Sequence, residues 1–260
     1  MSRMLSLNTQ DFATLRDKNM IYVDKTMYID KMRKMGRQFF LARPRRFGKS
    51  LFASTLRYYF QGRKDLFEGL AISETEKDWT EHPVLHFAFI NADYTLEGAV
   101  DNSIHGILSN FEMVWGKSSG EITFGLRFEG IIRRAYEKTG KKVVIIIDEY
   151  DNPLVEVIDK PELKEKAKYT LKGFFGALKN MDEFIEFSFL TGITKFSKTS
   201  IFSGLNHLTD ISMFNSFSAI CGITEMELHD NYNDVIEEFG KKQNLTLEET
   251  YSALKKFYDG

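Results

Sequence analysis

The chain has 260 residues, which is enough for one large domain or for one domain with a small appendage. Its 43% hydrophobic and 28% charged residues are typical of a globular protein and exclude a disordered or fibrous chain. The 35 lysines and arginines nearly balance the 37 acidic residues, so direct nucleic-acid binding by a strongly basic surface is not expected.

Three further features concern the cellular compartment. Cys221 is the only cysteine, so an internal disulfide is excluded and a reducing compartment is favoured. The longest apolar run, 143–147, is far shorter than the roughly 20 residues of a membrane span. The N-terminus lacks the apolar stretch of a signal peptide. These features predict a cytoplasmic protein that does not contact membranes.

In the first half of the chain, strands and helices alternate. Residues 39–42 form a short apolar run, and 49–60 have apolar side chains at helical spacing, with Gly62 as the stop signal. Residues 84–90 are typical of a buried strand. Two helices are expected at 103–115 and 126–138, and Gly140 would end the second.

The second half continues the alternation. Residues 143–147 are all β-branched, and their unbroken apolarity is typical of a strand covered on both faces. A helix is expected to begin at Pro161, followed by strands at 184–190 and 219–223. Two sequences typical of capping boxes, Thr224 with Glu227 and Thr246 with Glu249, predict helix starts near the C-terminus.

Alternating strands and helices with apolar strands predict an α/β fold in which helices flank a mostly parallel sheet. We expect this domain to span residues 1–223. Residues 224–260 contain only helical signals and are expected to form a small helical extension packed on the sheet.

The segment 43–50, Arg-Pro-Arg-Arg-Phe-Gly-Lys-Ser, lies between a predicted strand and a predicted helix, as a phosphate-binding loop does. Turn N–H groups and the helix dipole attract an anion there. Lys49 would contact the outer phosphates and Ser50 would ligate Mg²⁺. The predicted nucleotide-binding residues are Arg43, Arg45, Arg46, Phe47, Gly48, Lys49, Ser50 and Leu51.

The first glycine of the phosphate-loop pattern is replaced by Arg43 in this chain. A residue with a side chain has to avoid positive φ at that position, so the loop must turn differently. The alternative interpretation is an ordinary strand-to-helix turn. Arg43, Arg45 and Arg46 could instead contact nucleic-acid phosphates, although nucleotide phosphates explain them sufficiently.

The apolar run 143–147 leads directly into Asp148 and Glu149. A strand that ends in two carboxylates is how a phosphate-loop NTPase places a metal-associated aspartate and a water-activating glutamate at the sheet edge. We therefore predict that Asp148 contacts Mg²⁺, and that Glu149 and Lys49 are catalytic. A solvated strand end is the alternative.

A third polar group follows the strand predicted at 184–190. Thr191 and Thr194 are candidates for holding the attacking water or sensing the terminal phosphate, and Lys195 is a weaker candidate for neutralising phosphate charge. The alternative is a Thr/Gly-rich turn without chemistry. The five histidines lack the spacing of a metal site, and Cys221 is expected to pack as a small apolar side chain.

In several segments the sequence resembles the bacterial AAA-ATPase-like family, members of which often carry a C-terminal PD-(D/E)xK nuclease-like domain. The segments, in chain order, are 22–26, 43–50, 60–62, 66–70, 148–151, 191–193, 222–225 and 258–260. The resemblance implies a P-loop NTPase core of the additional-strand type, with ATP and Mg²⁺ as cofactors. It gives Lys49 and Ser50 the phosphate and metal roles, Asp148 and Glu149 the acidic-strand roles, and makes arginine the usual residue at position 43.

These observations lead us to expect a slow Mg²⁺-dependent ATPase that acts as a nucleotide-driven switch. The alternatives are a non-hydrolysing interaction module on the same scaffold and, less favoured, a small-molecule phosphotransferase. A protein partner or a nuclease-like domain outside this chain is expected, because the resemblance continues past Gly260. Nuclease activity of this chain is not expected, and a homo-oligomer that supplies an arginine from a neighbour is left open.

Overall fold

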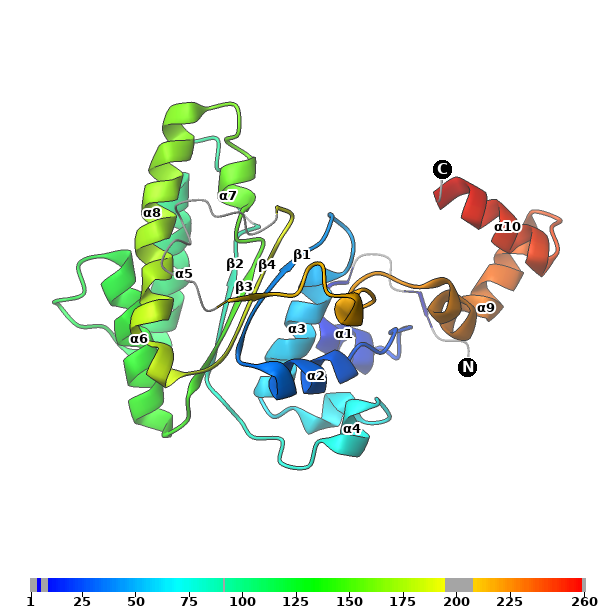
Figure 1. Cartoon of the computed structure of the whole chain (residues 1–260), viewed down its shortest axis with the longest axis horizontal. Coiled ribbons are helices and arrows are strands. Elements are labelled where there is room, and N and C mark those ends of the chain that lie inside the picture. Colours follow the sequence, from blue (N-terminus) through cyan, green and yellow to red (C-terminus); the bar gives the residue numbers. More distant parts are fainter. Residues whose placement is uncertain (1–3, 6–8, 91, 195–207, 259–260) are drawn as a thin grey trace.

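A computed structural model describes residues 4–5, 9–90, 92–194 and 208–258 (Figure 1). Its centre is a five-stranded sheet with the order β2-β3-β4-β1-β5, in which every neighbouring pair is parallel. The strands are β1 (Gln38–Ala42), β2 (Val84–Ala88), β3 (Val143–Asp148), β4 (Ile185–Gly192) and β5 (Thr209–Asp210). The expected α/β architecture with a mostly parallel sheet is confirmed.

Helices cover both faces of the sheet (Figure 1). One face carries α5 (Ala99–Trp115), α6 (Phe124–Thr139) and α8 (Pro161–Asn180), and the other carries α1 (Phe12–Asp17), α2 (Met27–Met35) and α3 (Lys49–Phe60). The short helices are η1 (Lys64–Phe67), α4 (Ile72–Thr75), α7 (Asn152–Val155), η2 (Asp182–Phe184) and η3 (Asn215–Phe217). Two apolar cores result, one on each side of the sheet.

The strands that position the site lie in the middle of this sheet. All six residues of β3 are buried, because strands pair with it on both edges and helices cover both faces. β4 lies between β1 and β3, with Leu190 opposite both Phe40 and Ile147. In the sheet, β4 thus lies between β3, which leads into the two acids, and β1, which precedes the phosphate loop.

The prediction of a strand at 219–223 is wrong. These residues form turns and bends after η3, and the fifth strand is instead the two-residue β5, which pairs with β1. Ile220 and Cys221 are buried by packing against the α3 side of the core and not by strand pairing. An apolar run indicates burial, but it does not distinguish a buried turn from a strand.

The C-terminal residues form two helices, α9 (Glu225–Lys242) and α10 (Leu247–Tyr258). Both predicted capping boxes cap these helices: Glu227 N donates to Thr224 Oγ1 (3.2 Å) and Glu249 N to Thr246 Oγ1 (3.3 Å). The expected packing on the sheet is wrong, because the two helices contact each other and lie beside the body of the molecule (Figure 1). Lys25, in the segment before α2, forms an ion pair with Glu227 and joins α9 to that body.

Within the described ranges, none of the helices is both long enough and apolar enough to cross a lipid bilayer.

Candidate functional site

The carboxyl ends of β1, β3 and β4 meet at one edge of the sheet, and the predicted site residues follow these strands. Between β1 and α3 the chain turns through two residues of positive φ, Arg46 (65°) and Gly48 (88°). Arg43, at the position of the pattern's first glycine, does not have positive φ, so the loop makes its left-handed turns at Arg46 and Gly48 instead. Gly48 precedes α3 without a side-chain cap, so the first N–H groups of this 12-residue helix are left for an anion.

Lys49 begins α3 and is directed toward the acidic end of β3. Its side chain is only 3% exposed, and its ammonium lies 3.1 Å from Glu149 Oε1. The same ammonium donates a hydrogen bond to the carbonyl of Pro44 (3.2 Å), inside the loop. The structure thus brings together the loop lysine and one of the two acids that the sequence places a hundred residues later.

Asp148 lies at the end of β3 with its carboxyl group almost completely buried. Burial raises the pKa of this carboxyl group to about 6, although a hydrogen bond from Ser50 acts in the opposite direction. Asp148 Oδ1 is buried and has no hydrogen-bond partner within the described part of the chain. An unpaired carboxylate oxygen beside a serine hydroxyl suits Mg²⁺, which usually takes one or two protein ligands and completes its shell with phosphate and water oxygens.

Glu149 leaves the strand with a φ of 53°, in the left-handed region that side chains rarely adopt. This turn ends the extended backbone of β3 directly after Asp148. The Asp148 carboxyl group therefore stays near Ser50, whereas the Glu149 carboxylate meets Lys49. The two acids thus have different neighbours, and the separate tasks assigned to them remain predictions.

The two candidate threonines have different surroundings. Thr191, at the end of β4, is fully buried, and its hydroxyl has no hydrogen-bond partner among the described residues. Thr194 donates its hydroxyl to Asp151 Oδ2 (2.5 Å) and lies 3.3 Å from the Tyr150 hydroxyl. Lys195, the weaker candidate, lies outside the described residues.

The Arg43 guanidinium contacts the protein itself. It donates to the carbonyls of Ala42 (3.0 Å), Ser212 (2.7 Å) and Phe217 (3.1 Å). The loop is also tied to the segment after η3 through Gly222 N, which donates to the Phe47 carbonyl (2.7 Å). The nucleotide contact assigned to Arg43 remains a prediction, and its observed contacts brace the loop.

Two cavities meet at the loop. The larger, about 740 Å³, is lined by Arg45, Arg46, Lys49, Ser50 and Glu149, together with Gly48, Leu51, Ile90, Asn152, Thr9 and Gln10. The smaller, about 290 Å³, shares Arg46, Gly48, Leu51 and Thr9 with it and has a mostly apolar lining. That lining includes Tyr22, Val23, Phe47, Ile223 and Tyr232. A polar cavity thus adjoins an apolar one across the phosphate loop.

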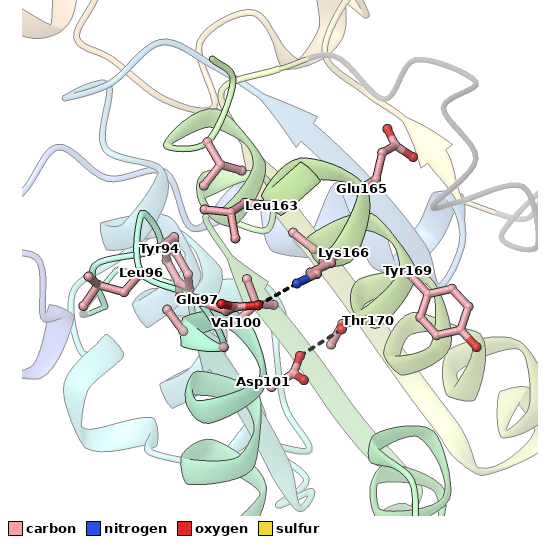
Figure 2. Close-up of a pocket in the computed structure, with 14 residues that line it drawn as sticks. Tyr94, Leu96, Glu97, Val100, Asp101, Leu163, Glu165, Lys166, Tyr169 and Thr170 are labelled. Carbon is pink, nitrogen blue, oxygen red and sulfur yellow. Dashed lines mark hydrogen bonds and ion pairs between the residues drawn. The ribbon is translucent and has the colours of Figure 1, made fainter. Parts of the chain in front are cut away.

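A third cavity, about 490 Å³, lies between the start of α5 and α8 and contains none of the residues predicted from the sequence (Figure 2). Lys166 forms an ion pair with Glu97 there (2.6 Å), and Thr170 donates a hydrogen bond to Asp101 (2.8 Å). The ion-paired side chains are 66% and 77% exposed, so they mark an open surface depression and not a desolvated site.

Sequence reasoning gave no role to three residues that the structure places at or near the loop. Asp151 is 1% exposed and accepts hydrogen bonds from the turn that contains Thr194. Asn152 lines the larger cavity and donates to the Phe89 carbonyl (3.0 Å). Lys25 lines the smaller cavity. The resemblance includes the segments of Asp151 and Lys25, but no local pattern shows what these side chains contact.

Comparison with known proteins adds an independent observation. A family model described as "Predicted AAA-ATPase" matches residues 6–202. An "Uncharacterized protein in vnfD 5'region" of Azotobacter chroococcum mcd 1 is 37% identical over 228 residues, which are 87% of this chain and 44% of that protein. The chain thus spans less than half the length of this relative. No solved structure matches.

Proposed function

Because this chain belongs to the predicted AAA-ATPase family, we propose that it binds ATP with Mg²⁺ at the phosphate loop and hydrolyses it slowly as a nucleotide-driven switch. The observation that supports this most strongly is the 3.1 Å contact between Lys49 and Glu149 at the carboxyl edge of the sheet. A loop lysine and a carboxylate in one cavity, with a metal-suited aspartate hydrogen-bonded to the loop serine, are the groups that phosphoryl transfer to water needs.

The two adjoining cavities fit the two ends of a nucleotide. The polar cavity presents Lys49, two arginines and the uncapped start of α3 to the phosphates. The apolar cavity, with the rings of Tyr22 and Tyr232 and the side chain of Val23 in its lining, suits a base. We assign the phosphates to the first cavity and the base to the second.

Ser50 and Asp148 would hold Mg²⁺, which neutralises charge on the phosphate oxygens when it is bound. A triphosphate would compete with Glu149 for the Lys49 ammonium, and this exchange would free the Glu149 carboxylate. Glu149 then accepts the proton of a water molecule that attacks the terminal phosphorus, while the bond to the bridging oxygen breaks and ADP leaves. In this proposal, the ion pair with Lys49 keeps the Glu149 carboxylate from acting as the proton acceptor until a phosphate group binds Lys49 in its place.

Two variants test the assignment. Lys49→Ala should abolish the thermal stabilisation by ATP and Mg²⁺, which is about 2.7 kcal/mol at one hundred times the dissociation constant. Glu149→Gln should stop phosphate release without weakening ATP binding, because it removes the proton acceptor together with the carboxylate that competes with phosphate for Lys49. Lys141→Ala, an exposed lysine ahead of β3 at its other end, is the matched control and should behave as the parent protein.

Unchanged ATP affinity in Lys49→Ala would exclude the phosphate role of this lysine. ATP binding by the parent protein without any phosphate release would favour the alternative, a non-hydrolysing interaction module on the same scaffold.

A further inference from the structure

Asp151 is a buried carboxylate that accepts hydrogen bonds from two consecutive residues of one turn. Its side chain is 1% exposed, and buried carboxylates require strong partners. The donors around it come from one turn: Ile193 N (3.1 Å), Thr194 N (2.6 Å) and the Thr194 hydroxyl (2.5 Å) all reach Oδ2. Ile193 N also lies 3.2 Å from Oδ1. A single side chain therefore holds the two residues that follow β4.

Tyr150 also contacts this turn, through its amide and its hydroxyl. Its amide donates to the Thr191 carbonyl (3.0 Å), and its hydroxyl lies 3.4 Å from the Thr194 carbonyl oxygen. The approach is so close that a Cβ on Gly192 would lie 2.4 Å from Asp151 Oδ1 and 2.6 Å from a Tyr150 ring carbon. Only glycine fits between the two side chains.

These contacts connect two parts of the site. Asp151 follows Asp148 and Glu149 on the same backbone, so its carboxylate moves with the two acids. The turn that it holds follows Thr191, which lies beside Asp148 because the preceding pair in the register is Leu190 with Ile147. The Thr191 hydroxyl is fully buried and has no partner within the described residues.

We propose that Asp151 is a positioning residue: it fixes the end of β4 against the two acids, so that Thr191 and Thr194 keep their place beside the terminal phosphate and the attacking water. This inference rests on the proposed ATPase function. It assigns to Asp151 an effect on the rate of hydrolysis and not on the affinity for nucleotide, because its carboxylate contacts the turn and not the phosphate loop.

Asp151→Asn tests the proposal, because the amide lacks the charge and one of the two acceptor oxygens that the turn uses. We expect at least a tenfold lower kcat for ATP hydrolysis, with the dissociation constant for ATP and Mg²⁺ within threefold of the parent. Asp159→Asn, an exposed aspartate eight residues later, is the matched control and should change neither quantity.

A second pair of variants tests the hydroxyl contact between Thr194 and Asp151, and it applies even where Asp151→Asn folds poorly. Thr194→Val should lower kcat with unchanged ATP affinity, and Thr194→Ser, which keeps the hydroxyl, should recover most of that loss. A purely structural defect would lower the melting temperature in step with the rate and would not separate kcat from affinity.

The outcomes separate this inference from the function on which it rests. An active parent protein with kcat unchanged in both Asp151→Asn and Thr194→Val would overturn the positioning role and leave the ATPase assignment standing. A parent protein that binds ATP but never releases phosphate would overturn the hydrolytic function, and the positioning role with it.

Discussion

Glu149 shows how a single residue combines a backbone cost with a chemical role. A non-glycine residue at a φ of 53° costs on the order of 1 kcal/mol or more, and such positions concentrate at functional sites. The carboxylate nevertheless lies against Lys49, an arrangement that continuing the extended strand would not produce. The strained turn is therefore part of how the two acids acquire different neighbours.

We expect His86, on the edge strand β2, to make the stability of the folded protein decrease at acidic pH. Burial lowers the pKa of its imidazole from 6.5 to about 4, the positive charge of Arg57 acts in the same direction, and its Nε2 has no partner in the described structure. The unfolded chain therefore binds a proton near pH 6.5 that the folded chain does not accept until about pH 4. Stability from this group is complete above pH 6.5 and is lost as the pH falls toward 4.

Urea unfolding at pH 7 and pH 5 measures this effect. His86 should account for a loss of roughly 2 kcal/mol between these pH values. His86→Leu and His86→Gln cannot titrate at this position. Between pH 7 and pH 5, the free energy of unfolding of each variant should therefore decrease by roughly 2 kcal/mol less than that of the parent. An identical decrease in the parent and in both variants would show that other groups cause the acid sensitivity.

At the scale of single elements, α6 and α8 pack directly against each other on one face of the sheet. The rings of Phe128 and Phe174 stack with centroids 4.8 Å apart. The helices approach so closely that a Cβ on Gly125 would lie 2.8 Å from the Gly173 carbonyl oxygen, whereas a Cβ on Gly173 meets nothing within 4 Å. Two glycines on facing helices thus have opposite tolerance for a side chain.

Gly125→Ala should consequently destabilise the fold by about 1–3 kcal/mol, because the helices must separate to make room. Gly173→Ala should stabilise it by about 0.5–1 kcal/mol, since alanine restricts the unfolded chain and favours the helix. Chemical denaturation of both variants checks the pair. Equal shifts in the same direction would contradict the packing explanation.

Elements were predictable from the sequence where one strong signal determined them. The β-branched run of β3 and the loop that starts α3 gave correct positions. α5 begins four residues before its expected start, directly after Gly98, a glycine of positive φ. β5 escaped prediction because two polar residues, Thr209 and Asp210, carry no periodicity, and its existence depends on pairing with β1.

The site was predictable to a similar extent. The proximity of Lys49 and Glu149 follows from parallel topology, which brings the carboxyl ends of separate strands to one edge. The contacts of Asp151 could not be predicted, because its partners lie 42 and 43 residues later and a buried carboxylate looks like any other aspartate in a sequence. The arginine at position 43 was expected at the nucleotide, and its observed partners are backbone carbonyls.

At the scale of the whole molecule, the ion pair between Lys25 and Glu227 joins the helices α9 and α10 to the rest of the chain. The Lys25 and Glu227 side chains are 9% and 23% exposed, so water screens the pair only weakly. The smaller cavity lies at this junction, because Lys25 and Tyr232 of α9 both contribute to its lining. A base in that cavity would contact the body and the C-terminal helices together.

Lys25→Met keeps most of the side-chain volume but removes the charge, and it should lower the free energy of unfolding by about 1–2 kcal/mol. Lys34→Met, which removes the exposed pair with Asp30, should cost less than about 0.5 kcal/mol. Denaturation gives both values, and hydrogen exchange should show faster opening of α9 only in the first variant. Similar losses in the two variants would mean that burial adds nothing to the Lys25 pair.

The arginine that replaces the first loop glycine has a consequence for how this chain can change. Its guanidinium donates to the carbonyl oxygens of Ala42, Ser212 and Phe217, so a glycine at position 43 would leave these three acceptors without their donor. A substitution at position 43 therefore also affects the segment around η3, which supplies two of the three acceptors. Arg43 thus ties the phosphate loop to residues about 170 positions later in the chain, and a change on either side of this contact has consequences for the other.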